Sequence, residues 1–207
     1  MLKLYYTPGT CALASHIALE DAGAAFEAVR VSFKTNEQNS PEYLAINPKG
    51  RVPSLVTDRG ILTETPAMLA FIAQSFPQAK LAPLDDPFAF AEVQAFNSYL
   101  CSTVHIAHAH RMRGYRWASE ETSFADMQRM VPKSMGACYR MIEQNMLRGP
   151  WVMGERYTIC DPYLFTLVQW MEGDSVNSAD FPRIRDHFER MAARASVRKA
   201  IAEETSR

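Results

Sequence analysis

Cys11 lies where a predicted strand passes into a predicted helix, at the turn Thr7-Pro8-Gly9-Thr10. If the helix begins near Thr10, unpaired backbone N–H groups and the helix dipole favour negative charge on the thiol. Such a position lowers the pKa of a thiol and produces the nucleophilic thiolate at neutral pH. The alternative is a small buried apolar side chain, which is the usual role of a free cysteine. Because Ala14 stands three residues on, no C-x-x-C pair forms here, and a disulfide cycle at Cys11 needs an external thiol.

The segment NPKGRVPSL contains a Val52-Pro53 step at the start of a predicted strand. Proline cannot donate to a sheet ladder, so either the strand lies at a sheet edge or the peptide bond is cis. A cis bond would turn the backbone N–H and C=O of Val52 outward, toward an extended ligand. Cis bonds before proline are a small minority, so the step alone does not predict one.

The segment LTETPA has the features of a helix start. Thr65 is a good N-cap residue, and Pro66 at the first helical position loses only an N–H that would have no partner anyway. The hydroxyl and N–H of Thr65 at a helix N-terminus suit a carboxylate, and Glu64 beside it suits an ammonium group. The pair therefore fits the α-amino acid end of a ligand. The alternative is a plain capped helix with a solvated glutamate.

Two histidines, His105 and His108, share one face of a predicted long helix with Ser98, Cys101 and Met112, because these residues are three or four apart. Paired histidines suggest a metal site, but no nearby carboxylate completes a ligand set, so we expect no metal. The other interpretation is a polar face between two domains.

Composition excludes several classes of function. The chain has 207 residues, 47% of them hydrophobic, and a formal net charge of -1, which gives no support for nucleic acid or an anionic membrane as partner. No run of about 18 apolar residues predicts a membrane span, and no secretory pattern is seen at the amino terminus. We therefore expect a cytoplasmic protein with four reduced cysteines, namely Cys11, Cys101, Cys138 and Cys160.

The two halves of the chain differ in pattern. Residues 1–77 alternate between strand-like and helical segments in the order β-α-β-loop-β-β-α, with a polar stretch over residues 34–42. Residues 78–87 contain two prolines and two acids and are predicted to form a linker. Residues 88–207 are predicted to be all helical, with long helices over 88–115 and 119–147, a buried helix over 158–171 and two shorter helices after 181 and 196. The predicted fold is a small α/β domain followed by an all-α helical bundle.

Taken together, YYTPGTCALASH, NPKGRVP and LTETPA, followed by a linker and an all-α region, resemble the glutathione S-transferase family. YTPGTC resembles most closely the bacterial beta class. This resemblance covers nearly the whole chain, and it implies a thioredoxin-like first domain and glutathione as substrate or co-substrate. It also implies a homodimer and small hydrophobic electrophiles as second substrates. GERYTICD resembles the family's capping box, in which Thr158 caps a buried helix and Asp161 returns to its start, a folding element rather than a catalytic one.

The resemblance assigns roles to particular residues. Glu64 and Thr65 would hold the γ-glutamyl end of glutathione, the backbone of Val52 would hold its cysteinyl unit through a cis bond to Pro53, and Cys11 would lie beside its sulfur. The catalytic candidates are Cys11 and His105. The predicted glutathione contacts are Thr10, Cys11, Lys34, Arg51, Val52, Pro53, Glu64, Thr65 and His105.

This sequence departs from the beta-class pattern on the long helix. Val104-His105 matches a family Val-His-Lys step that faces the active site, but Ile106 replaces the lysine and Ser98 replaces an asparagine. Chemistry that needs a cation beside the thiol is therefore in question, and Arg111, Arg113 or His108 would have to supply the charge. The predicted electrophile pocket consists of His108, Arg111 and Met112.

Two mechanisms and three activities remain open from sequence. Cys11 either forms a mixed disulfide with glutathione or donates a hydrogen bond to its thiolate, assisted by Thr7, Thr10 or His105. The first hypothesis is conjugation of glutathione to an electrophile or thiol exchange. The alternatives are a glutathione-binding protein without turnover and a glutathione-dependent isomerase or dehalogenase, since fold alone does not establish activity.

Overall fold

The computed structural model describes residues 1–206 and begins with a four-stranded sheet. Its strands are β1 (Leu2–Tyr6), β2 (Phe26–Arg30), β3 (Ser54–Thr57) and β4 (Gly60–Thr63), in the order β2-β1-β3-β4. β1 and β2 are parallel, whereas β3 runs antiparallel to both β1 and β4. Parallel neighbours require a crossover connection, which α1 (Ala12–Asp21) supplies, and Gly60 allows the tight β3–β4 turn at a φ of 135°.

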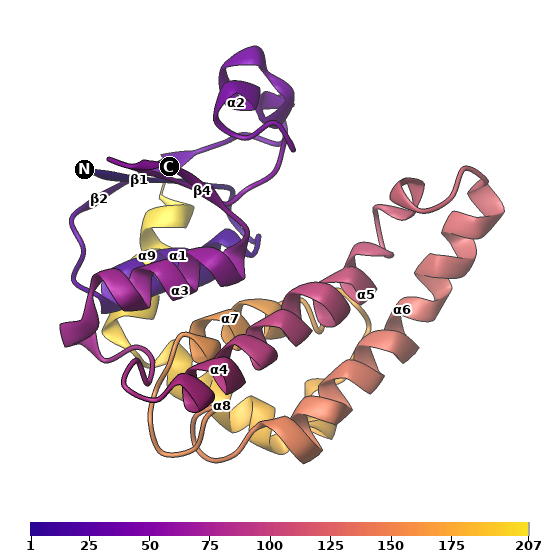
Figure 1. The fold of residues 1–207 in the computed structure, drawn as a ribbon. Helices are drawn as coiled ribbons and strands as arrows, with labels where there is room; N and C mark the ends of the chain where they lie inside the picture. The colour runs from indigo at the N-terminus through magenta and orange to yellow at the C-terminus, as the bar shows by residue number, and fades with distance from the viewer. Residues whose placement is uncertain (207) are drawn as a thin grey trace.

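Two helices, α1 and α3 (Thr65–Ser75), cover one side of this sheet (Figure 1). Leu4 and Leu55 of the sheet pack with Leu69 and Ile72 of α3 in the main core, and all four are fully buried. α1 is apolar around most of its circumference because it contacts α3, α7 and α9 in addition to the sheet. The predicted thioredoxin-like order is confirmed.

A short helix, α2 (Pro41–Ile46), was not expected, and the sequence prediction of a polar loop before YLAINP is incomplete. Ser40 caps this helix, with its hydroxyl accepting from the backbone N–H of Tyr43 at 3.1 Å, and Pro41 occupies the first turn. α2 lies beyond the sheet edge in Figure 1. It matters for the site because Tyr43 and the buried Asn47 both donate to the carbonyl of Arg51 at 2.7 Å, which fixes the segment before Val52.

From residue 87 to residue 205 the regular elements are helical. The helix predicted over 88–115 is interrupted: α4 (Pro87–Tyr99) passes through a π-helical turn at Leu100–Val104 into α5 (His105–Ala109), where regular helix ends. π turns within helices are frequent at functional sites. The remaining helices are α6 (Glu121–Met141), α7 (Cys160–Val168), α8 (Pro182–Ala192) and α9 (Ala195–Thr205).

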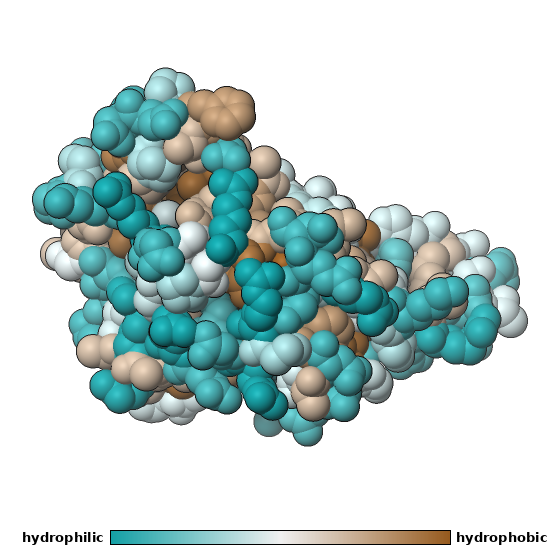
Figure 2. All heavy atoms as spheres, turned by 90° about the horizontal axis from the view of Figure 1, so that it is seen from below, coloured by the Kyte–Doolittle hydropathy of each residue, from teal (hydrophilic) through white to brown (hydrophobic). Residues whose placement is uncertain are grey.

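Contacts between the two parts of the chain centre on α1, which packs against α7 from the helical bundle and α9 from the end of the chain. α6 extends with its N-terminal end away from the rest of the molecule (Figure 1). The face in Figure 2 is largely hydrophilic, with apolar side chains in small separate groups. Within residues 1–206 no helix combines the length and the apolar character needed to span a membrane.

Candidate functional site

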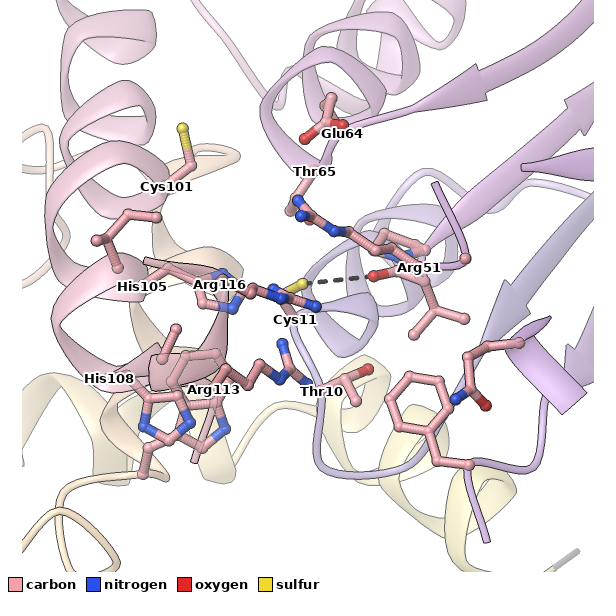
Figure 3. A pocket seen from close by; sticks show the side chains of 18 of the residues that line it. Thr10, Cys11, Arg51, Glu64, Thr65, Cys101, His105, His108, Arg113 and Arg116 are labelled. Carbon is pink, nitrogen blue, oxygen red and sulfur yellow. Dashed lines mark hydrogen bonds between the residues drawn. The ribbon is translucent and has the colours of Figure 1, made fainter. Parts of the chain in front are cut away.

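A cavity of about 780 Å³ lies between the first part of the chain and the helical bundle, with Cys11 at its centre (Figure 3). The turn before α1, the residues before β3, the start of α3, the π turn with α5, and the segment after α5 all contribute to its walls. The predicted site residues that line it are Thr10, Cys11, Arg51, Val52, Pro53, Glu64, Thr65, His105 and His108. Lys34, Arg111 and Met112 do not line this cavity.

Cys11 is the N-cap residue of α1 and is nearly buried, with 7% of its surface exposed. Its thiol donates to the carbonyl oxygen of Val52 at 3.8 Å, which is the dashed line in Figure 3. The turn before it is held by Thr10, whose hydroxyl donates to the carbonyl of Thr7 at 2.7 Å. The thiol is therefore positioned by contacts from two separate segments of the first part of the chain.

The pKa of Cys11 is raised, which corrects the prediction that the helix start would lower it. Burial of the thiol is the largest cause and raises the pKa, while the hydroxyl of Thr65 and the charge of Arg113 lower it by less. Burial wins because the thiolate loses water that a single helix N-terminus does not replace. In this structure Cys11 is a thiol at neutral pH and a hydrogen-bond donor.

The Val52–Pro53 peptide bond is cis, as the family resemblance implies. Val52 and Pro53 are both buried against the cavity, and the carbonyl of Val52 faces the Cys11 thiol. The hydroxyl of Tyr43 and the amide of Asn47 hold the preceding carbonyl of Arg51, so the segment is fixed on both sides.

Glu64 and Thr65 begin α3 at the cavity wall. Glu64 is the N-cap residue and has a φ of 71°, a conformation that costs a residue with a side chain about 1–3 kcal/mol and is concentrated at functional sites. Thr65 is the first helical residue rather than the predicted N-cap, and only 4% of its surface is exposed. The carboxylate of Glu64 is 2.5 Å from the ammonium of Lys49, so this position already holds a cation of the chain.

His105 lies on α5 opposite Cys11, half-buried and in edge contact with Trp170 at 5.0 Å between ring centroids. The pKa of His105 is lowered to about 4, chiefly by burial and to a smaller extent by the positive groups of His108, Arg113, Arg116 and Arg51. His105 is therefore neutral at neutral pH and contributes no cation to the site.

His108 stacks on Trp170 at 4.1 Å, and its Nδ1 lies 2.8 Å from a carboxylate oxygen of the buried Asp174. The guanidinium of Arg111 lies 3.7 Å from the same carboxylate. Arg111 is held at Asp174, and Met112 is 77% exposed. Of the three residues predicted to form the electrophile pocket, His108 alone lines the cavity. Within residues 1–206, neither His105 nor His108 belongs to a group of three side chains placed to bind a metal ion.

The segment Arg113-Gly114-Tyr115-Arg116-Trp117 supplies much of the remaining wall. The sequence pattern predicts a helix that runs to residue 115, and Arg113 is the one residue of this segment among the predicted cations near the thiol, which also include Arg111 and His108. The alternation of basic and aromatic residues is a signal that was available in the sequence. The direction of Arg113 and Arg116 toward Cys11 was not, because it depends on the helix ending at Ala109.

Fold and cavity together describe a thioredoxin-like domain that presents a thiol to a pocket shared with a helical bundle. Comparison with known proteins agrees, since residues 1–74 match the family model for the glutathione S-transferase N-terminal domain. The chain is 31% identical to the glutathione S-transferase GstA of Escherichia coli O157:H7, over 98% of both chains. It therefore belongs to the glutathione S-transferase family.

Solved structures give the same result over the full length. A glutathione transferase homologue from Sulfitobacter with bound glutathione is 48% identical, with a TM-score of 0.95 over 98% of both chains. A bacterial beta class glutathione S-transferase from Sphingomonas chungbukensis is 31% identical, with a TM-score of 0.86 over 98% of both chains.

Proposed function

We propose that this protein is an intracellular glutathione transferase that joins the sulfur of glutathione to a small electrophile. The observation that carries the proposal is that Cys11, the Val52 backbone, Glu64 and Thr65 open into one cavity that the helical bundle completes. We further propose a beta-class enzyme that acts as a homodimer in the cytoplasm. The class assignment rests on YTPGTC, on Val104-His105 and on the likeness to the Sphingomonas enzyme, and the homodimer is proposed from the family resemblance alone.

The proposed binding mode follows the charges of the site. The γ-glutamyl carboxylate is placed at the start of α3, where Thr65 and unpaired backbone N–H groups favour an anion, and its ammonium is placed at Glu64, in exchange for Lys49. The cysteinyl backbone pairs with Val52. The glycyl carboxylate is directed to Arg51, which lines the cavity and has no ion-pair partner within residues 1–206.

In the proposed reaction, the glutathione thiol loses its proton to solvent, and the thiolate attacks the electrophilic carbon. A carbon–sulfur bond forms, and the bond to the leaving group breaks with its electron pair. Cys11 donates its S–H to the developing thiolate, which agrees with its raised pKa, and Arg113 supplies the positive charge that Ile106 does not. Such preorganised donors and charges stabilise an anion without reorganisation.

Changing the two residues at the start of α3 tests the binding mode. We expect Glu64→Gln and Thr65→Val each to raise the KM for glutathione about 10- to 100-fold, because each removes a hydrogen bond to a charged group, worth about 1.5–3 kcal/mol. Steady-state conjugation of 1-chloro-2,4-dinitrobenzene at varied glutathione gives the KM. Retention on immobilised glutathione provides a second measurement that does not need turnover.

Glu121 and Thr122 offer a matched control, because they are exposed, stand at the start of another helix, α6, and do not line the cavity. Glu121→Gln and Thr122→Val should leave the KM unchanged. If the protein is retained on immobilised glutathione but conjugates no electrophile in a panel, it is a glutathione-binding protein and not a transferase. An unchanged KM for glutathione in both site variants would refute the binding mode.

Substitution of Cys11 separates its two proposed roles. We expect Cys11→Ala to lower kcat/KM about 10-fold and to raise the pKa of the bound glutathione thiol, because one donor to the thiolate is lost. Cys11→Ser keeps a donor and should recover most of the rate. The pH dependence of kcat/KM and the thiolate absorbance of the glutathione complex measure the effect.

The mixed-disulfide mechanism makes a different prediction for the same variants. If the Cys11 thiolate attacks oxidised glutathione, the disulfide of that molecule breaks, one glutathione leaves as a thiolate and the other stays bound to Cys11. Wild-type protein then gains one glutathione in intact-mass analysis, and both Cys11→Ala and Cys11→Ser lose it together with thiol-transfer activity. The raised pKa of Cys11 predicts slow adduct formation at pH 7 that accelerates as the pH rises. An adduct that persists in Cys11→Ser would instead point to Cys101, Cys138 or Cys160.

A further inference from the structure

We propose that the electrophile subsite selects second substrates that carry a carboxylate on a flat unsaturated body, and that Arg113 and Arg116 bind this carboxylate. This inference rests on the proposed function, since it names the class of electrophile that the same cavity takes. Three observations support it: the positive charge of the side chains that line the cavity, the position of two of these arginines on the wall formed after α5, and the aromatic side chains beside them.

The cavity is far more positive than the chain as a whole. The formal net charge of the chain is -1, yet the cavity is lined by Arg51, Arg113 and Arg116 against a single carboxylate, that of Glu64. Glu64 is already paired with Lys49. A pocket with this excess of positive charge favours anionic ligands and raises their local concentration.

The arginines of this cavity differ from a neighbour in the same segment. Arg111 lies 3.7 Å from the carboxylate of the buried Asp174, whereas within the described part of the chain neither Arg113 nor Arg116 forms an ion pair or a side-chain hydrogen bond. Arg113 is half-buried. Charged side chains are seldom removed from water without a partner, so a half-buried guanidinium that faces a cavity indicates an anionic ligand.

The guanidinium group of Arg113 is also close enough to those of Arg116 and Arg51 to be repelled by both. Burial lowers the pKa of Arg113, and the charges of Arg116 and Arg51 lower it further. Figure 3 shows Arg113 and Arg116 directed toward the region of Cys11, from the side of the helical bundle. A bound carboxylate would relieve this repulsion, and planar guanidinium groups match its geometry.

Glutathione itself does not account for all of this charge. In the proposed binding mode its two carboxylates are directed to the start of α3 and to Arg51, both in the first part of the chain. Arg113 and Arg116 come from the segment after α5, on the opposite wall. Arg116 therefore remains for the second substrate, and Arg113 lies where it can act both on the carboxylate of that substrate and on the glutathione sulfur.

Aromatic side chains beside these arginines define the rest of the ligand. Tyr115 and Trp117 alternate with the arginines in the segment, and all four residues line the cavity. Trp170, which stacks with His108, lies on the same side of the site. Aromatic walls next to guanidinium groups suit a flat apolar body with an anionic end.

Two electrophiles that differ only in charge test the proposal, 4-chloro-3-nitrobenzoate and its neutral amide, 4-chloro-3-nitrobenzamide. After division by the uncatalysed rate of each, kcat/KM should favour the benzoate about 10-fold at low ionic strength, with the preference falling as salt is added. Arg113→Met and Arg116→Met should each remove most of the preference, and Arg116→Lys should retain part of it. Arg129→Met, which removes an exposed arginine on α6 outside the cavity, should have no effect.

This design distinguishes substrate binding from thiolate stabilisation. If Arg113 acts only on the glutathione sulfur, Arg113→Met lowers the rates for benzoate and benzamide equally, and the proposal is overturned. If both substrates are conjugated with equal efficiency by wild type, the proposal also fails while the transferase function stands. A lower KM for the benzoate in wild type, lost in Arg116→Met, supports it.

If no conjugation is seen, the proposed transferase function fails, but the proposed carboxylate site can still be tested by a binding measurement. The probes are the two products, glutathione bearing a 4-carboxy-2-nitrophenyl or a 4-carbamoyl-2-nitrophenyl group on sulfur. Calorimetry should give a dissociation constant about 10-fold lower for the carboxylate than for the amide, and equal values in Arg113→Met and Arg116→Met. Equal affinities in wild type would overturn the proposal whatever the activity.

Discussion

Asp161→Ala is expected to lower the free energy of unfolding by about 3–5 kcal/mol, because it removes one partner from a fully buried network that includes a charge. One carboxylate oxygen of Asp161 accepts from the backbone N–H of Val152 at 2.8 Å and faces Nε2 of His187 at 3.0 Å. The other accepts from the backbone N–H of Thr158 at 2.7 Å. Asp161 and His187 are both completely buried, so water cannot replace these contacts.

The network fixes the beginning of α7, the helix through which the bundle packs on α1. The hydroxyl of Thr158 accepts from the backbone N–H of Cys160 at 3.3 Å, which completes the expected capping arrangement. Alanine would leave two backbone N–H groups and a histidine nitrogen without acceptors, each costing about 1–3 kcal/mol. The substitution therefore weakens the packing between the two parts of the chain as well as the start of α7.

Urea unfolding at pH 7 and one protein concentration measures the effect. Asp161→Asn keeps one acceptor oxygen and should lose less than the alanine variant. Asp186→Ala is the matched control, because Asp186 is exposed and pairs with Arg190 four residues on, an interaction worth about 0.5 kcal/mol or less. Similar small losses in Asp161→Ala and Asp186→Ala would show that the network is not what holds the start of α7.

Much of the fold follows from local patterns in the sequence. The strand at Leu2–Tyr6, the helix after Cys11 and the β3–β4 hairpin are each encoded by alternation, helical spacing or a turn residue within a few positions. α2 was missed although Ser40-Pro41 is a regular helix start, because a polar stretch is equally typical of a loop. The π turn at Leu100–Val104 and the helix end at Ala109 coincide with no Gly or Pro, so the predicted extension of this helix to residue 115 was wrong.

The electrostatics of the site could not be derived from neighbouring residues. A cysteine at a helix start is expected to have a low pKa, but Cys11 is covered by Val52 and by the opposite wall, and burial outweighs the helix. Arg111 and Arg113 are two positions apart, yet one pairs with Asp174 and the other faces the cavity. Such differences depend on contacts between residues far apart in the chain, which a single sequence does not reveal.

Lowering the pH from 7 to 4 is expected to cost the wild-type protein roughly 3 kcal/mol of stability through His105 alone. The pKa of His105 is lowered from 6.5 to about 4 in the folded protein, with burial as the largest cause. The unfolded chain therefore takes up a proton as the pH falls through 6.5, whereas the folded protein does not until about pH 4. This contribution to stability is complete above pH 6.5, is reduced by roughly 2 kcal/mol at pH 5, and is lost by pH 4.

His105→Gln removes the titrating group. The difference in unfolding free energy between wild type and variant should therefore change by roughly 2 to 3 kcal/mol between pH 7 and pH 4.5. His110→Gln removes another histidine, just past the end of α5 and in contact with Trp117, and controls for the loss of one imidazole. Urea unfolding at pH 7, 6, 5 and 4.5 provides the comparison. A constant difference across this range would mean that His105 titrates in the folded protein as it does in the unfolded chain, so that it becomes a cation opposite Cys11 below about pH 6.5. Below that pH the thiolate of glutathione would be stabilised by His105 as well as by Arg113, and the role proposed for Arg113 would be shared.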